Sequence, residues 1–181
     1  LEGAVIATSD VRPTLAEVEA VLPRFTGLIE QVPPAYSAIL IDGQRAYDLA
    51  RAGTAVEMKM RAVTVYSLAT ACRTNGETMD SVTLTAHVSK GTYIRSLARD
   101  IALALGTVGH VTMLRRVKAG PFTLDAAISL DKLRDAAKER AIGELMLPLT
   151  AGLDDIPALP VSPDEALMLR QGKVLMGKPH I

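Results

Sequence analysis

Apolar residues recur at the spacing of an amphipathic helix in several parts of the chain. The first such stretch follows Thr14 and Glu17, which have the spacing of a capping box and can bond the unpaired amides of a helix N-terminus. Gly53, Gly106 and Gly172 follow later stretches, as is common at helix C-termini. The pattern predicts helices over residues 14–23, 45–52, 92–105 and 130–141, and a last helix opened by Ser162-Pro163.

Between the helical stretches lie runs rich in Val and Thr, in which apolar and polar residues alternate as they do in strands. The two longest runs are 56–72 and 79–89. The Asn75-Gly76 pair between them favours a tight hairpin turn. The same reasoning predicts shorter strands over residues 36–41, 110–118 and 121–124.

The composition is that of a globular protein with an aliphatic core. Of the 181 residues, 49% are hydrophobic and only 3% are aromatic. The sequence has no secretory signal and no apolar run of about 18 residues, so we expect a cytoplasmic protein. The single cysteine, Cys72, excludes an internal disulfide and is expected to be a buried structural thiol. Because the chain has only this cysteine and three histidines, we predict no metal site.

The two ends of the chain and one internal stretch bear on its organisation. The chain begins at Leu1 without a methionine and stops abruptly at Ile181, which we interpret as a fragment of a longer protein. The proline-containing stretch 148–162 is typical of a linker. We therefore expect a first domain over residues 1–147 and the start of a second over residues 148–181.

Charge is distributed unevenly although the net charge is zero. Residues 1–31 contain five acidic and two basic residues, whereas residues 87–120 contain six basic residues and one acidic residue. Zero net charge argues against a nucleic-acid binder. A local basic stripe, however, predicts a face that contacts phosphate groups, and the alternative is an ordinary solvated surface.

The motif with the most functional groups suited to ligand binding covers residues 89–95, at the predicted junction of a strand and a helix. Gly91 allows a ligand to approach the backbone closely, and the first amides of a helix point outward toward anions. Lys90, Tyr93 and Arg95 add an ammonium, a phenol and a guanidinium. The motif is suited to binding a phosphate or a polar base, although a capped helix with a solvated basic face would have similar residues.

Aromatic and basic residues also lie together in the stretch 31–53. A rigid Pro-Pro segment precedes Tyr36, and Arg45 and Tyr47 follow on or near the predicted short helix. Rings that stack on bases and cations that contact phosphates are the usual means of gripping RNA. The same residues can equally serve surface and core packing.

The stretch 110–116 combines an apolar and a basic side. Alternation along the predicted strand would direct Leu114 to one face and Arg115 to the other, with Arg116 next to them. A single histidine such as His110 is more often structural than a ligand. This stretch is therefore a candidate for binding and not for metal ligation.

The order and spacing of the three blocks 31–53, 89–106 and 110–122 resemble the TruB family of tRNA pseudouridine synthases. The resemblance extends over residues 1–150 and implies an α+β fold, with a pseudouridine synthase-like sheet that is mixed, largely antiparallel and flanked by helices. The tail, residues 148–181, resembles the start of the small, PUA-like C-terminal RNA-binding domain that follows in this family.

The resemblance implies a reaction: uridine-55 of the tRNA T loop is flipped out of the stack and isomerised to pseudouridine, without a metal or organic cofactor. Tyr93 matches the tyrosine that lies against the flipped base. Arg95 matches the arginine that pairs with the catalytic aspartate and favours its ionised form. Lys90 and Leu114 match residues of the base pocket. We expect a monomer that binds the T arm, with Tyr36, Arg45, Tyr47, Arg115 and Arg116 as further substrate-binding residues.

Two positions depart from the family's pattern. The family's nucleophile lies in a Gly-x-x-x-Leu-Asp-x-x-Ala-x-Gly motif upstream of every block found here. Asp125, which also follows a leucine, lacks the flanking glycines and is rejected as the nucleophile. Leu40 stands where the family usually has a lysine. That lysine is a candidate RNA contact, so this chain would bind RNA differently at this position. We expect this chain alone to be inactive, because the nucleophile is absent from it.

Three functional hypotheses follow. The first is a tRNA uridine-55 pseudouridine synthase of which this chain is a part. The second is a non-catalytic RNA-binding module that uses the basic stripe. The third is a relative that depends on a guide RNA and modifies ribosomal RNA within a protein–RNA particle.

Overall fold

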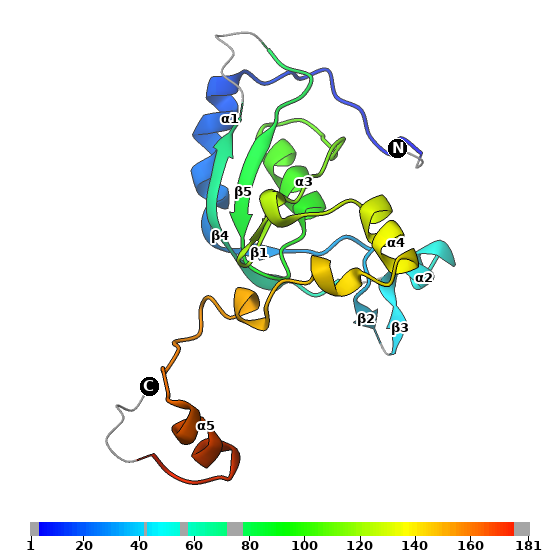
Figure 1. Ribbon diagram of the computed structural model, residues 1–181. Coiled ribbons are helices and arrows are strands. Elements are labelled where there is room, and N and C mark those ends of the chain that lie inside the picture. Colours follow the sequence, from blue (N-terminus) through cyan, green and yellow to red (C-terminus); the bar gives the residue numbers. More distant parts are fainter. Residues whose placement is uncertain (1–3, 42, 55–57, 72–77, 176–181) are drawn as a thin grey trace. The chain divides into compact units, whose positions relative to one another are not determined.

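The structure is a computed structural model that describes residues 4–41, 43–54, 58–71 and 78–175. The chain divides into two compact units, residues 1–114 and residues 115–181. Figure 1 shows the elements of both units. Cys72 and the predicted Asn75-Gly76 turn lie outside the described residues, and the domain division predicted after residue 147 stays a prediction.

The first helix of the first unit begins where the sequence predicts. Helix α1 (Leu15–Val21) is capped by Thr14, whose hydroxyl accepts from the backbone N–H of Glu17 at 3.3 Å. The carboxylate of Glu17 in turn accepts from the backbone N–H of Thr14 at 2.7 Å. Two of the amides at the helix N-terminus that lack an intrahelical partner are thus satisfied. A short 3-10 helix, η1 (Leu22–Phe25), follows directly.

A three-stranded antiparallel sheet forms the centre of the first unit. Its strands are β1 (Gly27–Gln31), β4 (Arg61–Thr70) and β5 (Leu84–Val88), in the order β1-β4-β5. Strands β4 and β5 lie within the two long runs predicted from the sequence. Strand β1 was not predicted, and it pairs with β4 so that Ile29 lies opposite Val63.

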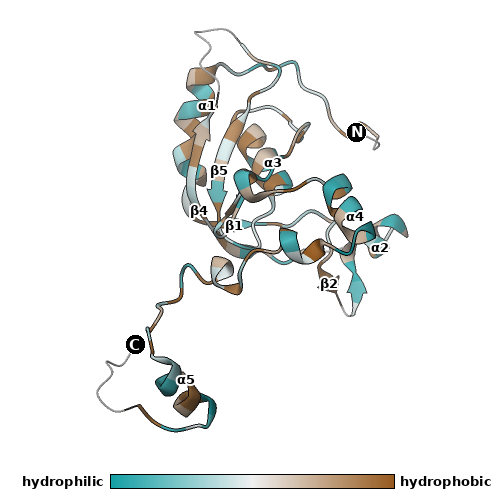
Figure 2. Ribbon diagram, in the orientation of Figure 1, coloured by the Kyte–Doolittle hydropathy of each residue, from teal (hydrophilic) through white to brown (hydrophobic). Residues whose placement is uncertain are grey.

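Two helices cover the same face of this sheet (Figure 1). Helix α3 (Ile94–Ala104) lies with α1 over the sheet, and Val18, Leu97 and Ile101 are almost fully buried between them. Figure 2 shows the hydrophobic and hydrophilic positions of α3 on different sides of the helix. The sheet contributes partly buried side chains to this core: Ile29, Leu68 and Leu84. Together with the antiparallel pairing, this arrangement confirms the predicted α+β class.

The segment after β1 forms a small substructure of its own. It contains β2 (Leu40–Ile41), β3 (Gln44–Arg45) and helix α2 (Ala46–Arg51). The helix predicted over residues 45–52 is confirmed. The strand predicted over residues 36–41 is reduced to two residues, because the chain before β2 bends sharply instead of extending. Backbone bonds from Ala46 to Ile39 (2.7 Å) and from Tyr47 to Ser37 (3.1 Å) hold the helix to this bend.

The second unit contains short elements. They are the hairpin β6 (Lys118–Ala119) and β7 (Phe122–Thr123), the 3-10 helices η2 (Leu124–Ala126), η3 (Ile142–Leu145) and η4 (Leu149–Gly152), and the helices α4 (Leu130–Lys138) and α5 (Pro163–Arg170). Helices α4 and α5 confirm the last two helices predicted. The strand predicted over residues 121–124 is confirmed as the shorter β7.

The strand predicted over residues 110–118 is wrong except at its end. The chain from 110 to 117 has no regular secondary structure, and Met113 and Leu114 are 63% and 67% exposed. Alternation of apolar and polar residues suits a strand only where a neighbouring strand satisfies the backbone groups. No described strand pairs with this stretch.

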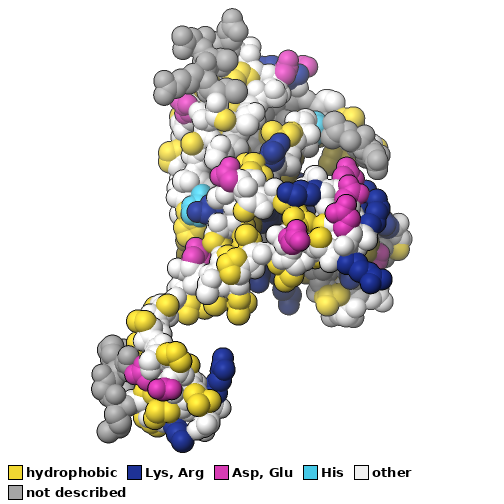
Figure 3. Space-filling model, in the orientation of Figure 1, with side chains coloured by type: hydrophobic (Ala, Val, Ile, Leu, Met, Phe, Trp, Pro, Cys, Tyr) yellow, Lys and Arg dark blue, Asp and Glu magenta, His cyan; other side chains and the backbone are white. Residues whose placement is uncertain are grey.

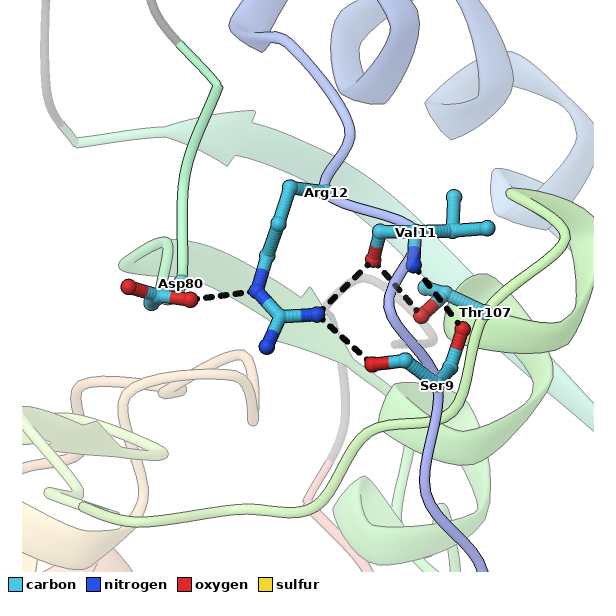
Figure 4. Close-up of polar contacts among 5 residues, drawn as sticks. All are labelled: Ser9, Val11, Arg12, Asp80 and Thr107. Carbon is cyan, nitrogen blue, oxygen red and sulfur yellow. Dashed lines mark hydrogen bonds and ion pairs between the residues drawn. The ribbon is translucent and has the colours of Figure 1, made fainter.

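A cluster of polar contacts fixes the segment that precedes α1 (Figure 4). The guanidinium of Arg12 forms an ion pair with Asp80 and donates to the carbonyl of Ser9 at 2.7 Å. The hydroxyl of Thr107 donates to the carbonyl of Val11 at 3.1 Å. The segment is therefore attached both to the chain before β5 and to the turn after α3.

The capping box of α1 gives a testable pH dependence. Hydrogen bonds from the backbone and hydroxyl of Thr14 lower the pKa of Glu17 below its ordinary value of 4.5. A depressed carboxyl pKa contributes stability above the unfolded-state value and loses it as the pH falls through the folded-state value. We expect the free energy of unfolding to fall with acidification below pH 4.5 less steeply in Glu17→Gln, which cannot titrate, as measured by urea unfolding between pH 3 and 7. Identical pH slopes would contradict the role of this carboxylate.

Candidate functional site

The sequence motif over residues 89–95 forms the connection from β5 to α3. Gly91 has a φ of +88°, a conformation that residues with a side chain rarely adopt. Ser89 is held against β4 from both sides: its backbone N–H donates to the carbonyl of Thr64 at 2.8 Å, and its hydroxyl accepts from the N–H of Thr64 at 2.9 Å. The turn is thus fixed to the sheet, and Lys90 at its tip is exposed.

Tyr93 is the N-cap residue of α3, and its backbone is bound by the side chain of Gln31. The Tyr93 N–H donates to Oε1 of Gln31 at 3.0 Å, and Nε2 of Gln31 donates to the Tyr93 carbonyl at 3.4 Å. Gln31 is the last residue of β1 and is only 1% exposed. The start of α3 is therefore linked to β1, 62 residues earlier in the chain.

The first turn of α3 also binds the segment that follows β1. Nη2 of Arg95 donates to the carbonyl of Tyr36 at 2.8 Å. The carbonyl of Val32 accepts two bonds, from the hydroxyl of Ser96 at 2.8 Å and from Nη2 of Arg99 at 3.2 Å. We call these contacts the brace, made by Gln31, Val32 and Tyr36 on one side and by Tyr93, Arg95, Ser96 and Arg99 on the other.

The brace leaves functional groups of Arg95 and Tyr36 accessible. Arg95 is exposed, and its one described bond uses a single nitrogen of the guanidinium. Since a guanidinium has five N–H donors in a planar fork, the others remain available for a carboxylate or phosphate. The side chain of Tyr36 is likewise exposed, at 56%. Two of the predicted blocks, 31–53 and 89–106, therefore meet at this point.

A second cluster of predicted residues lies on and near α2. The guanidinium carbons of Arg45 and Arg51 lie 5.9 Å and 5.3 Å from the centre of the Tyr47 ring. Both arginines are exposed, and Tyr47 is half-buried between them. Nη1 of Arg45 also donates to the hydroxyl of Tyr47 at 3.5 Å, and the remaining N–H groups of this guanidinium are available for solvent or an anion. Arg45 and Tyr47 are thus brought together as predicted.

The remaining predicted residues are distributed over the two units of the chain. Leu114 is an exposed residue at the end of the first unit, and Arg115 and Arg116 are exposed residues at the start of the second. The basic stripe predicted over residues 87–120 is therefore divided between the two units. The structure does not bring Leu114 into contact with the brace through any described hydrogen bond.

Charges on the second unit are mixed in sign. Figure 3 shows acidic and basic side chains next to one another on the surface. On α4, Arg134 pairs with Asp131 at 3.1 Å, and Lys138 pairs with Asp135 at 2.9 Å, with all four side chains exposed. Paired cations of this kind form a solvated surface and attract phosphates weakly.

Two further features are absent from the described residues. No group of three or more His, Cys, Asp or Glu residues in these ranges could hold a metal ion. Among the same residues, no helix is long and apolar enough to cross a lipid bilayer.

Sequence reasoning missed the buried half of the brace. Gln31 and Ser96 are both 1% exposed, and each binds a backbone group more than 60 residues away in the chain. A polar residue two positions before a Pro-Pro segment was the only available signal for Gln31. No local pattern specifies a partner at that distance, so the contacts became visible only in the fold.

Comparison with known proteins defines the class to which this arrangement belongs. The chain matches the N-terminal domain of TruB family pseudouridylate synthases over residues 1–94, and the C-terminal domain of tRNA pseudouridylate synthase B over residues 95–154. The fold and the motifs are therefore those of a pseudouridine synthase. Within that class, the chain belongs to the TruB family.

Individual relatives agree with this assignment. The tRNA pseudouridine synthase B of Novosphingobium aromaticivorans is 59% identical over 180 residues, which cover 99% of this chain and 59% of that protein. The one from Zymomonas mobilis is 54% identical over 176 residues, which cover 97% of this chain and 57% of that protein. The chain thus spans less than three fifths of the length of these relatives.

A solved structure is similar as well. A chain in the crystal structure of a Cbf5-Nop10-Gar1 complex has a TM-score of 0.58 and 28% sequence identity to this chain. The similarity covers 81% of this chain and 40% of that one. This agreement extends the sequence match to the three-dimensional fold.

Proposed function

We propose that the full-length protein is a tRNA pseudouridine synthase that converts uridine-55 of the T loop to pseudouridine. Membership of the TruB family supports this proposal, as do the names of the relatives. The observation that carries it is the brace, because it joins the two motif blocks that the family resemblance connects with RNA binding and catalysis. A cytoplasmic monomer that acts on the T arm of tRNA is part of the same proposal.

In this proposal the brace region supports one wall of the base pocket. Tyr93 lies against the flipped uracil, and Arg95 pairs with the catalytic aspartate, which this chain does not contain. The guanidinium favours the ionised carboxylate, which is the form that acts as a nucleophile. Holding Arg95 by the Tyr36 carbonyl fixes its direction before the substrate binds. Lys90 and Leu114 complete the pocket.

The substructure around α2 is proposed to hold the T arm. Arg45 and Arg51 present two cations close to the ring of Tyr47, within the segment that the brace attaches to α3. Phosphate contacts by such cations position an RNA without reading its sequence. Leu40 is exposed where a lysine is usual, so we assign the electrostatic contacts here to Arg45 and Arg51.

The direct test compares two preparations on a T-arm hairpin, with pseudouridine measured by mass spectrometry after selective labelling. We expect the full-length protein to form pseudouridine at the position of uridine-55 and this chain alone to form none. Hairpin binding by both preparations, without a reaction by either, would favour a non-catalytic RNA-binding module instead. Activity of the isolated chain would show that the aspartate requirement is wrong.

Salt dependence tests the proposed phosphate contacts of Arg115 and Arg116. Removing one cation that neutralises a phosphate should reduce the slope of log affinity against log salt by about 0.7 to 0.9. We therefore expect the double variant Arg115→Ala/Arg116→Ala to flatten the slope for the hairpin, measured by fluorescence anisotropy between 50 and 300 mM salt. The matched control is Arg134→Ala/Lys138→Ala, which removes cations already paired with aspartates. An equal slope in all three proteins would mean that Arg115 and Arg116 are merely solvated.

A further inference from the structure

Gln31 has an unusual environment for an uncharged polar side chain. It is only 1% exposed and is the largest fully buried side chain of the described residues. Burying an amide is unfavourable unless its donors and acceptor are hydrogen-bonded. Both bonds found for this amide go to one residue, Tyr93: Oε1 accepts from the N–H at 3.0 Å, and Nε2 donates to the carbonyl at 3.4 Å.

The two backbone groups of Tyr93 differ in what helix α3 supplies: its carbonyl also accepts from the N–H of Leu97 at 3.0 Å, whereas its N–H has Gln31 as its described partner. Tyr93 is the N-cap, so its backbone is extended (φ −95°, ψ 105°) and its N–H has no partner within the helix. The side-chain cap that such a residue often provides is absent. Gln31 therefore supplies the bond that determines how the chain enters α3.

Strand pairing fixes Gln31 itself. Its partner in the register with β4 is Arg61, and the four preceding residues of β1 are paired with β4 as well. The sheet thus fixes the position of Gln31. Gln31 in turn fixes the backbone of Tyr93 through two hydrogen bonds. Neighbouring bonds from Ser96 and Arg99 to Val32 limit rotation about this link.

We propose that Gln31 is a positioning residue for the reaction: it holds the backbone of Tyr93 so that the phenol ring faces the flipped uracil. This inference rests on the proposed function and deepens it. A glutamine is required because one acceptor and one donor must meet the N–H and the carbonyl of the same residue. Methionine has a similar length and provides neither group, and ionised glutamate would place a negative oxygen against the carbonyl.

The kinetic test uses the full-length protein with Gln31→Met. A small misplacement of a residue at a reacting centre can reduce the rate by about 100-fold. We expect kcat on the T-arm hairpin to fall about 10- to 100-fold, with KM changed by less than about threefold, since the RNA-binding side chains are retained. The exposed Gln171→Met is the matched control and should leave both constants unchanged. An unaltered kcat in folded Gln31→Met would overturn the proposal.

A second variant keeps the test valid if Gln31→Met does not fold. Glutamic acid in its protonated form has the same acceptor and donor pattern as glutamine, whereas ionised glutamate lacks the donor. Because burial favours the protonated form, activity of Gln31→Glu relative to the unsubstituted protein should rise as the pH is lowered from 8 to 6. A relative activity of Gln31→Glu that falls as the pH is lowered would contradict the required donor, because protonation then supplies the donor without restoring the rate.

Amide hydrogen exchange separates this proposal from the proposed function. In the 181-residue chain, the Tyr93 N–H should exchange slowly and should become faster in Gln31→Met, while amides in the middle of α1 keep their rates. This result is expected whether or not the full-length protein makes pseudouridine. Equal Tyr93 exchange in both proteins would refute the positioning role, whereas an inactive unsubstituted full-length protein would refute the proposed function.

Discussion

Replacing Arg95 by alanine is expected to lower the rate of pseudouridine formation by the full-length protein by about 100- to 1000-fold. This is the range typical for removing one preorganised electrostatic partner from a reacting centre. In the proposed function the guanidinium stabilises the ionised nucleophile, and its direction is fixed by the 2.8 Å bond to the Tyr36 carbonyl. Single-turnover kinetics on a T-arm hairpin would measure the change in the chemical step.

Two further variants separate the electrostatic role of Arg95 from its part in the brace. Arg95→Lys keeps a cation but not the planar fork, so we expect an intermediate rate. Arg24→Ala, which removes an exposed guanidinium from η1 in the same unit, should leave the rate unchanged. If Arg95→Ala lost hairpin binding and not the chemical rate, Arg95 would be an RNA contact and its proposed pairing with the aspartate would be wrong.

The largest loss of stability is expected from Leu97→Ala. Leu97 is 3% exposed and lies in the core cluster with Val18 of α1 and Ile101 of its own helix. Truncating a buried leucine removes transfer free energy and leaves a cavity, which together cost about 2–5 kcal/mol. A unit with a core this small has limited stability to lose. We therefore expect a clear decrease in the urea midpoint of this chain, followed by circular dichroism.

Leu103 provides a matched control on the same helix. It is 59% exposed, so Leu103→Ala removes the same atoms without opening a cavity. Exposed substitutions of this kind usually change the free energy of unfolding by no more than about 0.5 kcal/mol. Equal losses in Leu97→Ala and Leu103→Ala would indicate that α3 does not pack on α1 and the sheet as described.

The helices of this protein are encoded locally, and they were predicted well for that reason. Thr14 and Glu17 form the capping box that their spacing predicts, and Ser162 caps α5 in the same way. Both caps depend on residues within one helical turn. Helix α3 was expected over residues 92–105 and occupies Ile94–Ala104, because its apolar face is complete within the segment.

The strands were predicted less well, because they depend on distant parts of the chain. Strand β1 was missed because Gly27–Gln31 is short, and it becomes a strand only by pairing with β4, whose partner residues lie 30 to 38 positions further along the chain. The stretch 110–117 alternates convincingly in sequence and yet forms no strand, since no described partner lies alongside it. Strand formation depends on a neighbour, and a single sequence contains no direct record of that neighbour.

The same difference between local and distant contacts separates the site residues that were predicted from those that were missed. Tyr93 and Arg95 were found because they stand close together in one motif with evident chemistry. Gln31, which binds the backbone of Tyr93, and Ser96, which binds the carbonyl of Val32, were not found, since their partners are main-chain atoms of distant residues. The roles of Tyr93, Arg95, Lys90 and Leu114 remain predictions from the family resemblance. The roles of Arg115 and Arg116 remain predictions from the basic stripe.

The use of main-chain atoms by the brace has an evolutionary consequence. Ser96 and Arg99 both bind the carbonyl of Val32, a group that every amino acid possesses, and the Val32 side chain is 39% exposed. Selection that preserves these contacts therefore acts on positions 96 and 99 and hardly at all on position 32. Among descendants of this protein, position 32 is free to drift and to acquire new surface chemistry, while its contacts with α3 are inherited unchanged.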